Sequence, residues 1–166
     1  MDEKILRTGL INLNIPEIRY FPTIGSTNDE ALDWVEAGAG DGSIVIADHQ
    51  SAGRGRMNRS WITRAGTSLA VSVILRPKHE ELHKITLFSP LAAVGLCQTL
   101  DEMFGLKAMI KWPNDVLLDN KKVAGILVEG YWVAGTLQGV VIGIGVNITA
   151  KAVPWNIKLL YPATSI

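Results

Sequence analysis

The chain has 166 residues, of which 48% are hydrophobic, and its 16 basic side chains balance 16 acidic ones to a formal net charge of zero. This length suits one compact domain, and the neutral balance excludes a general electrostatic attraction to nucleic acid or to an anionic membrane. The polar N-terminus leads into no apolar segment with a cleavage site, so we expect a cytoplasmic protein. The single cysteine, Cys97, excludes a disulfide framework and a thiolate metal cluster, and we expect it to be a small core residue.

The hydrophobic pattern predicts a chain in which short strands alternate with helices. The expected strands are apolar or β-branched runs, and they cover residues 18–24, 43–47, 67–75, 108–111, 115–118, 123–130 and 137–148. The last run is apolar nearly throughout, which predicts a central strand covered on both faces. Helices packed on a mixed, mostly antiparallel sheet place the protein in the α+β class.

Two helices are expected between these strands. The first is capped by Ser26 or Thr27 and runs to about Ala37, because Thr27 has an acidic residue three positions later, the spacing of a capping box. The second covers residues 82–104, and its apolar composition predicts a buried helix rather than a membrane span. We expect this helix to bend near Pro90.

A segment rich in glycine and arginine, residues 50–61, lies between the second and third strands and reads QSAGRGRMNRSW. Glycines let the backbone approach a ligand closely, and guanidinium groups bind phosphate or carboxylate oxygens in pairs. The pattern therefore indicates a mobile loop that clamps an anionic ligand. It is also typical of a solvated basic loop or of a loop that binds nucleic acid backbone.

The second candidate is the turn at residues 111–115, which reads KWPND. The rigid proline would hold Lys111, Trp112 and the pair Asn114 and Asp115 at a strand end. An asparagine and an aspartate after proline are also ordinary turn residues, so the neighbouring cation and aromatic ring are what favour a functional site.

Two strands hold the remaining candidates. Lys122 leads into an apolar strand in which Gly125 leaves room for a ligand, although lysines at strand ends also commonly protect sheet edges. In residues 143–147, GIGVN, two glycines allow a close approach to the backbone and Asn147 offers a donor and an acceptor. No helix is expected to follow, so this is not a dinucleotide-binding fingerprint.

Residues 79–83 read HEELH and match the His-Glu-x-x-His pattern of zinc metalloproteases. That pattern requires a buried helix with both histidines on one face, whereas these residues lie where a strand gives way to a polar helix start. We therefore expect no zinc.

These segments, in this order and at these spacings, resemble the biotin protein ligase family over residues 25–166. The resemblance rests on the Gly-Arg-Gly-Arg loop that ends in Trp61, the Lys-Trp-Pro-Asn-Asp turn and the Lys-Val-Ala-Gly strand. It implies a class II synthetase-like catalytic domain that forms biotinyl-5'-AMP from biotin and ATP and transfers biotin to a lysine of a biotin carboxyl carrier protein. Lipoate-type adenylation and a non-catalytic biotin-binding module are the alternatives.

The resemblance also implies a role for each candidate residue. Biotin would contact the start of the first helix, the loop and the last strands, at Ser26, Thr27, Asn28, Gln50, Gly53, Arg54, Gly55, Arg56, Trp61, Lys122, Gly125, Leu127 and Gly143. ATP and the adenylate would contact Arg56, Arg59, Trp61, Lys111, Trp112, Asn114, Asp115, Lys122 and Asn147. Catalysis would depend on Lys122, Arg56 and Arg54, and Asp115 would lie near Mg²⁺.

A single catalytic domain over residues 1–166 is expected from the same resemblance. The helix-turn-helix segment that precedes this domain in some family members, and the small C-terminal β domain of many, are not found in the sequence. We therefore expect no DNA partner and no membrane partner. The long apolar strands are compatible with an edge-to-edge homodimer.

Overall fold

The computed structural model describes residues 3–153 and 159–166, which contain one seven-stranded sheet in the order β1-β2-β3-β7-β6-β5-β4. The strands are β1 (Ile18–Phe21), β2 (Ile44–Ala47), β3 (Ser68–Leu75), β4 (Met109–Lys111), β5 (Asp115–Leu118), β6 (Lys121–Val133) and β7 (Thr136–Asn147). The helices are α1 (Glu3–Leu10), α2 (Thr27–Glu36) and α3 (Phe88–Phe104), with two 3₁₀ helices, η1 (His79–Leu87) and η2 (Ala150–Ala152). β1 pairs with β2 in parallel and all other pairs are antiparallel, which confirms the predicted α+β class.

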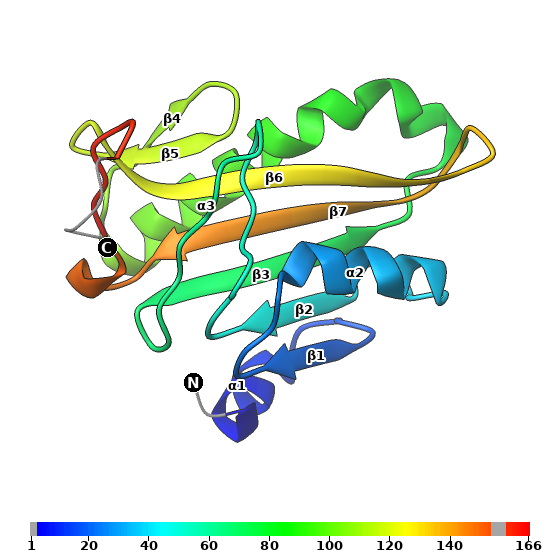
Figure 1. Cartoon of the computed structure of the whole chain (residues 1–166), viewed down its shortest axis with the longest axis horizontal. Coiled ribbons are helices and arrows are strands. Elements are labelled where there is room, and N and C mark those ends of the chain that lie inside the picture. Colours follow the sequence, from blue (N-terminus) through cyan, green and yellow to red (C-terminus); the bar gives the residue numbers. More distant parts are fainter. Residues whose placement is uncertain (1–2, 154–158) are drawn as a thin grey trace.

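The long hairpin of β6 and β7 forms the centre of the sheet (Figure 1). Val140 and Ile142 of β7 pack in a cluster with Ala93 of α3, whereas Val141 packs in a second cluster with Trp34 of α2. Because neighbouring residues of a strand point to opposite faces, the two helices cover opposite faces of the sheet. The prediction of a central strand covered on both faces is therefore confirmed.

Both strands of this hairpin are longer at the connecting turn than the apolar pattern predicted. Two residues connect them, and Ala134 and Gly135 have φ angles of +47° and +79°. Two consecutive positive φ angles match the twist of the flanking strands in a two-residue hairpin turn, so pairing continues up to the turn at Val133 and Thr136.

The start of α2 differs from the predicted capping box. Ser26 is the N-cap, and its hydroxyl accepts a hydrogen bond from the amide of Asp29 at 3.5 Å. Thr27 does not cap the helix, because its hydroxyl donates to a glutamine of the following loop, and Glu30 pairs with Arg19 of β1 at 2.7 Å. The capping box was wrong because tertiary contacts engage both of its side chains.

The second helix was predicted as one buried element over residues 82–104, but the structure divides it into two helices and buries only one side of the α-helix. The 3₁₀ helix η1 precedes α3. Pro90 lies in the first turn of α3, where backbone amides have no partner within the helix, so a proline costs no hydrogen bond there. Ala93 and Leu100 face the sheet, whereas Leu91 on the other side is 64% exposed. Cys97 is half-buried against the core. Within the described residues no helix has the length and apolarity needed to cross a membrane.

Candidate functional site

A pocket lies on the α2 side of the sheet, where the start of α2, residues 50–61 and strands β5 to β7 meet. The loop that contains residues 50–61 runs across this face of the sheet (Figure 1). The space between the lining residues amounts to about 740 Å³, open solvent at its mouth included. It brings together fifteen of the predicted residues: Ser26, Thr27, Asn28, Gln50, Arg54, Gly55, Arg56, Arg59, Trp61, Asn114, Asp115, Lys122, Gly125, Leu127 and Gly143.

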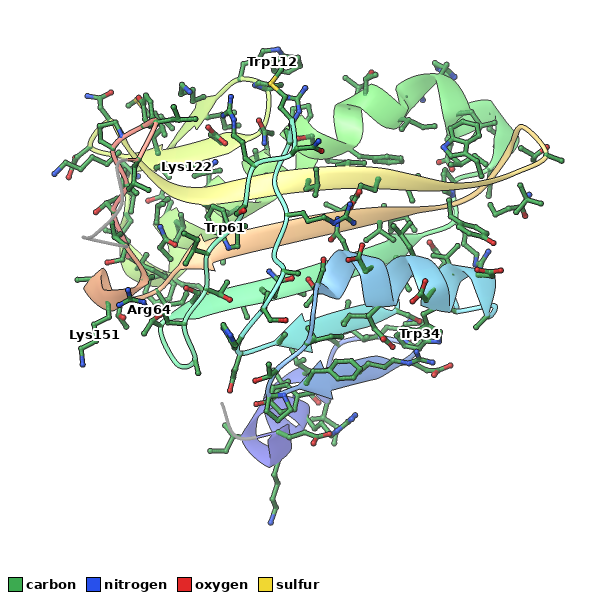
Figure 2. All side chains as sticks on the ribbon, in the orientation of Figure 1. Trp34, Trp61, Arg64, Trp112, Lys122 and Lys151 are labelled. Carbon is green, nitrogen blue, oxygen red and sulfur yellow. The ribbon has the colours of Figure 1, made fainter. Side chains whose placement is uncertain are left out.

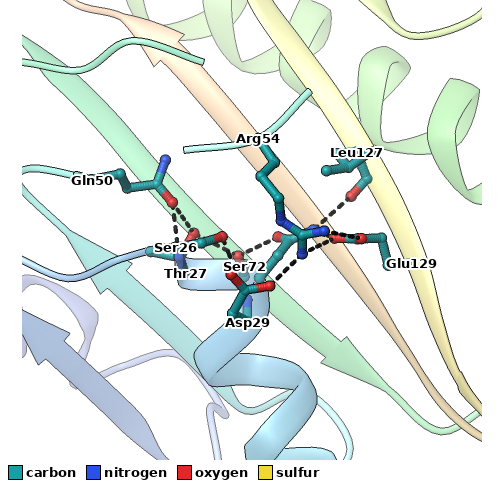
Figure 3. Close-up of polar contacts among 9 residues, drawn as sticks. Ser26, Thr27, Asp29, Gln50, Arg54, Ser72, Leu127 and Glu129 are labelled. Carbon is teal, nitrogen blue, oxygen red and sulfur yellow. Dashed lines mark hydrogen bonds and ion pairs between the residues drawn. The ribbon is translucent and has the colours of Figure 1, made fainter. Parts of the chain in front are cut away.

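One end of the pocket is polar but uncharged. The backbone amide and the hydroxyl of Thr27 donate to Gln50 Oε1 at 2.7 Å and 3.0 Å. Ser72 of β3, which is fully buried, places its hydroxyl 2.8 Å from Thr27 Oγ1 and 2.7 Å from Asn28 Oδ1. With Ser26, these side chains form a buried floor of neutral donors and acceptors at the N-terminus of α2 (Figure 3). Such a floor suits a neutral polar group of a ligand better than a charged one.

The glycines of β6 and β7 leave space for two large side chains. A Cβ atom at Gly143 would overlap the Asn28 amide, and one at Gly145 would overlap the Trp61 ring. At Gly125 a Cβ would lie 3.3 Å from the same ring. The sequence pattern suggested room for a ligand at these glycines, and the structure shows that side chains take up much of that room.

Trp61 lies over the central strands and lines the pocket (Figure 2). Its indole N–H is buried, and within the described part of the chain it has no hydrogen-bond partner. A buried donor without a partner costs about 1–3 kcal/mol, so this N–H is a candidate contact for a bound ligand.

The other end of the pocket is cationic. The ammonium group of Lys122 lies 2.6 Å from Asp115 Oδ1 and 5.4 Å from the centroid of the Trp61 ring. Lys111 approaches Asp115 Oδ2 from outside the pocket at 3.7 Å. Lys122 and Asp115 come from adjacent strands, and their side chains are only 25% and 15% exposed. Screening by water is therefore reduced around the pair, and the electrostatic attraction between the lysine and an anionic ligand would be strong.

The loop arginines have different surroundings. Arg54 forms ion pairs with Asp29 of α2 and Glu129 of β6. Arg56 reaches the amide oxygen of Asn114 at 3.5 Å, a long hydrogen bond to a neutral group. Within the described residues, neither Arg56 nor Arg59 has a carboxylate partner. These two guanidinium groups remain available to an anion, whereas the charge of Arg54 is already neutralised.

Four predicted residues lie outside the pocket lining: Gly53, Lys111, Trp112 and Asn147. Gly53 packs against the backbone of Trp61, and a Cβ there would overlap that carbonyl oxygen. Trp112 is 70% exposed, and the Lys111 ammonium lies 4.3 Å from the centroid of the Tyr161 ring. The exposed end of the 111–115 turn therefore faces away from the pocket lining, and only Asn114 and Asp115 reach it.

Asn147 holds the C-terminal residues 162–166 against the sheet. Its side-chain amide is buried and donates to the carbonyl of Thr164 at 2.9 Å. The same segment bonds both backbone groups of Lys122, which donates to the Pro162 carbonyl at 2.8 Å and accepts from the Thr164 amide at 2.9 Å. Residues 162–166 therefore form a C-terminal strap that fixes the backbone under the pocket lysine.

Asp115 is the carboxylate predicted to lie near Mg²⁺. In residues 3–153 and 159–166 no three His, Cys, Asp or Glu side chains are grouped to hold a metal ion. Magnesium at nucleotide sites usually needs only one or two protein carboxylates with substrate phosphates, so Asp115 fits that role. Residues 79–83, HEELH, lie in the 3₁₀ helix η1, whereas the zinc pattern requires a buried α-helix.

Several residues of the site had no role assigned to them from the sequence, although Ser60, Ile144 and Gly145 lie inside the predicted segments 50–61 and 143–147. Ser60, Ala70, Ile126, Ile144 and Gly145 also line the pocket, Ser72 supports its floor, and Glu129 binds Arg54. Ser72 had a signal, because it is a polar residue at an inward position of an otherwise apolar strand. For Glu129, the local sequence pattern gave no signal of a role in the site.

The mixed sheet and the pocket under an arginine loop define a domain of the biotin and lipoate ligase class. The chain belongs to the biotin/lipoate A/B protein ligase family, whose model matches residues 20–147. It is 38% identical over 147 residues to the bifunctional ligase/repressor BirA of Bacillus subtilis, with 89% of this chain and 45% of the relative covered. It is 44% identical over 125 residues to the biotin--[acetyl-CoA-carboxylase] ligase of Paracoccus denitrificans, with 74% of this chain and 51% of the relative covered.

A solved structure has the same fold. The biotin protein ligase from Aquifex aeolicus in complex with biotin and ATP aligns with a TM-score of 0.71 and 30% identity, covering 91% of this chain and 60% of the other. The chain spans about half the length of the curated relatives it matches.

Proposed function

We propose that this chain activates biotin with ATP to biotinyl-5'-AMP and transfers the biotinyl group to a lysine of a biotin carboxyl carrier protein or domain. The proposal rests above all on one observation, a single pocket that joins a buried, uncharged polar floor to a cationic end. It is supported by relatives that are named biotin ligases and by the Aquifex aeolicus structure, which holds biotin and ATP.

The uncharged floor suits the ureido ring of biotin, which offers two N–H donors and a carbonyl acceptor. Thr27, Asn28 and Gln50 present both kinds of hydrogen-bonding group, and Ser26 lies at the N-terminal end of α2. The apolar body of the ligand would then extend along Leu127 and Gly143 toward Lys122. This direction would bring the biotin carboxylate to the cationic end.

The first reaction step would be attack of a biotin carboxylate oxygen on the α-phosphorus of ATP, with cleavage of the bond to pyrophosphate. Lys122, Arg56 and Arg59 would neutralise the phosphate oxygens, and Asn114 would help to orient Arg56. Asp115 would hold Mg²⁺, which supplies further charge neutralisation at the phosphates when bound.

The second step would be attack of the acceptor lysine amine on the carbonyl carbon of the adenylate, with AMP as the leaving group and loss of one proton from the amine. Neither step needs a covalent enzyme nucleophile. We propose that the protein's contribution is positioning, charge neutralisation and exclusion of water by residues 50–61.

We further propose that residues 1–166 act as one catalytic domain in the cytoplasm. The described residues support one domain because they share one sheet and pack against its two faces. The sheet ends in two outer strands, β1 and β4, and either outer edge is compatible with a homodimer.

The test is incorporation of label from α-labelled ATP into an adenylate by the purified chain, with Mg²⁺ and either biotin or lipoate. We expect a labelled adenylate with biotin alone, and transfer to an acceptor carrier domain when one is added. An adenylate with lipoate alone would overturn the choice of substrate. Calorimetric binding of biotin without an adenylate would overturn the catalytic proposal and leave a binding module.

A further inference from the structure

In the loop over the pocket, Arg54 forms ion pairs with two carboxylates from different elements (Figure 3). Arg54 Nη1 lies 3.0 Å from Glu129 Oε1 and Nη2 lies 3.1 Å from Glu129 Oε2, a paired contact between guanidinium and carboxylate. Nη2 also pairs with Asp29 Oδ1 in the first turn of α2. Arg54 therefore connects the loop to a helix and a strand that are both parts of the rigid core.

Glu129 also connects this ion pair to the pocket floor. Its Oε2 accepts a hydrogen bond at 2.7 Å from the side-chain amide of Asn28, which also donates to the Leu127 carbonyl at 3.3 Å. Because an ionised carboxylate only accepts hydrogen bonds, Glu129 fixes the amide nitrogen of Asn28 toward β6 and its oxygen toward Ser72. The orientation of the floor amide and the position of the loop thus depend on one side chain.

The geometry separates this contact from an ordinary surface ion pair. Surface pairs contribute little because two flexible side chains must be ordered in water, but paired guanidinium contacts and shared networks contribute more. The Glu129 side chain is 23% exposed and starts from a central strand, so it is already ordered before Arg54 approaches.

We propose that Glu129, assisted by Asp29, is a positioning residue that holds Arg54 and so keeps residues 53–61 closed over the pocket. In this role Arg54 is an anchor of the loop and does not bind phosphate. Arg56 and Arg59 remain the cations that face a ligand. The inference rests on the proposed function only for the identity of the ligand, because closure of the loop can be measured without one.

The first experiment is amide hydrogen exchange of peptides that cover residues 53–61 in the free protein. The Gly55 amide bonds the Arg59 carbonyl at 2.7 Å and the Trp61 amide bonds the Gly53 carbonyl at 2.8 Å, both within the loop, so faster exchange of these amides reports loss of the ordered loop conformation. The change Glu129→Gln keeps the size of the side chain and an acceptor for Asn28 but removes the charge. We expect exchange in the loop to become about threefold to tenfold faster.

The matched control is Glu102→Gln, the same change at an exposed glutamate on α3. We expect its loop exchange to equal that of the unchanged protein. Asp29→Asn should give a smaller acceleration, because the paired contact with Glu129 remains. The double change Arg54→Ala with Glu129→Gln should open the loop no more than Arg54→Ala alone, since both changes remove one interaction.

Biotin kinetics provide a second readout that a merely structural role would not produce. Glu129→Gln should raise the biotin dissociation rate by a similar factor with little change in kcat at saturating biotin, so that KM carries the effect. Equal loop exchange in Glu129→Gln and Glu102→Gln, or additive effects of Arg54→Ala and Glu129→Gln, would overturn the inference. If biotin does not bind at all, the proposed function fails while the exchange result still decides the anchoring role.

Discussion

The ammonium group of Lys122 lies 2.6 Å from Asp115 Oδ1 and faces the ring of Trp61, with its centroid 5.4 Å away. The lysine is thus held between a carboxylate and an aromatic face at the cationic end of the pocket. A nucleotide phosphate at this end would compete with Asp115 for the same cation. Among the described residues, Asp115 is the only carboxylate paired with Lys122, and a bound anion could take its place.

Lys122→Ala should reduce adenylate formation by on the order of 100-fold or more, because a cation placed at developing phosphate charge is lost. The fold should be retained, since the side chain is not part of the apolar core. Single-turnover formation of labelled biotinyl-adenylate measures the effect. The matched control is Lys121→Ala at the exposed neighbouring position, which should leave the rate unchanged. Near-normal adenylate formation in Lys122→Ala would remove it from the catalytic set.

Arg56→Gly should loosen the hold on the adenylate, because Arg56 is a loop cation with no carboxylate partner among the described residues. The mixed anhydride would then escape and label lysines of bystander proteins. We expect biotinylation of added albumin to rise with this variant and to stay low with Arg64→Gly, which changes an exposed arginine outside the pocket lining. Equal labelling by both variants would show that Arg56 does not retain the adenylate.

Gly145→Ala and Gly95→Ala should change stability in opposite directions. The added methyl group at Gly145 meets the Trp61 ring, so overpacking should lower the free energy of unfolding by about 1–3 kcal/mol. At Gly95 in α3 nothing lies within 4 Å of the new Cβ, and replacing a helical glycine should raise stability by about 0.5–1 kcal/mol. Urea unfolding measures both. A Gly145→Ala variant with an unchanged free energy of unfolding would contradict the packing described.

Asn147→Ala should release the C-terminal strap, residues 162–166, because it removes the bond from the buried amide to the Thr164 carbonyl. We expect a loss of about 1–3 kcal/mol in the free energy of unfolding and faster amide exchange at Lys122 and Thr164. Asn14→Ala, at an exposed position in the segment before β1, is the control. A variant with a higher KM for ATP but unchanged exchange would assign Asn147 to the nucleotide and not to the strap.

Cys97 should react slowly with iodoacetamide at pH 8. Partial burial in α3 raises the pKa of its thiol, so the reactive thiolate is a smaller fraction than in a free cysteine at the same pH. The rate should increase to that of a model thiol when urea unfolds the protein. A native rate equal to the unfolded rate would show that the thiol is solvated.

Local sequence patterns predicted most of the fold because strands and helices leave periodic signatures. The run at residues 137–148 was apolar nearly throughout and became the central strand β7. The same reasoning failed for α3, since composition shows that a helix is apolar but not which of its sides another element covers. It allowed a cap at Ser26 or Thr27 and Ser26 is the cap, but the capping box predicted from Thr27 does not form, because Thr27 contacts Gln50, which is distant in sequence.

Local motifs also identified part of the site. Residues that stand in a local motif, such as Arg56 and Lys122, were identified from that motif and line the pocket. Glu129 lies in an ordinary apolar strand, and its role depends on Asn28, which is 101 positions away in the sequence. No local pattern encodes a contact of that separation.

The hydrogen bonds from Asn28 to Leu127 and Glu129 span 99 and 101 positions, and both join the start of α2 to β6. A nascent or partly folded chain that has not yet paired β6, β7 and β3 has no pocket floor, so it cannot recognise a ligand. Binding is therefore coupled to completion of the sheet, and a ligand present at 100 times its Kd should stabilise the native protein by about 2.7 kcal/mol. The concentration of ligand would then influence how much of this protein survives proteolysis, independently of the rate of catalysis.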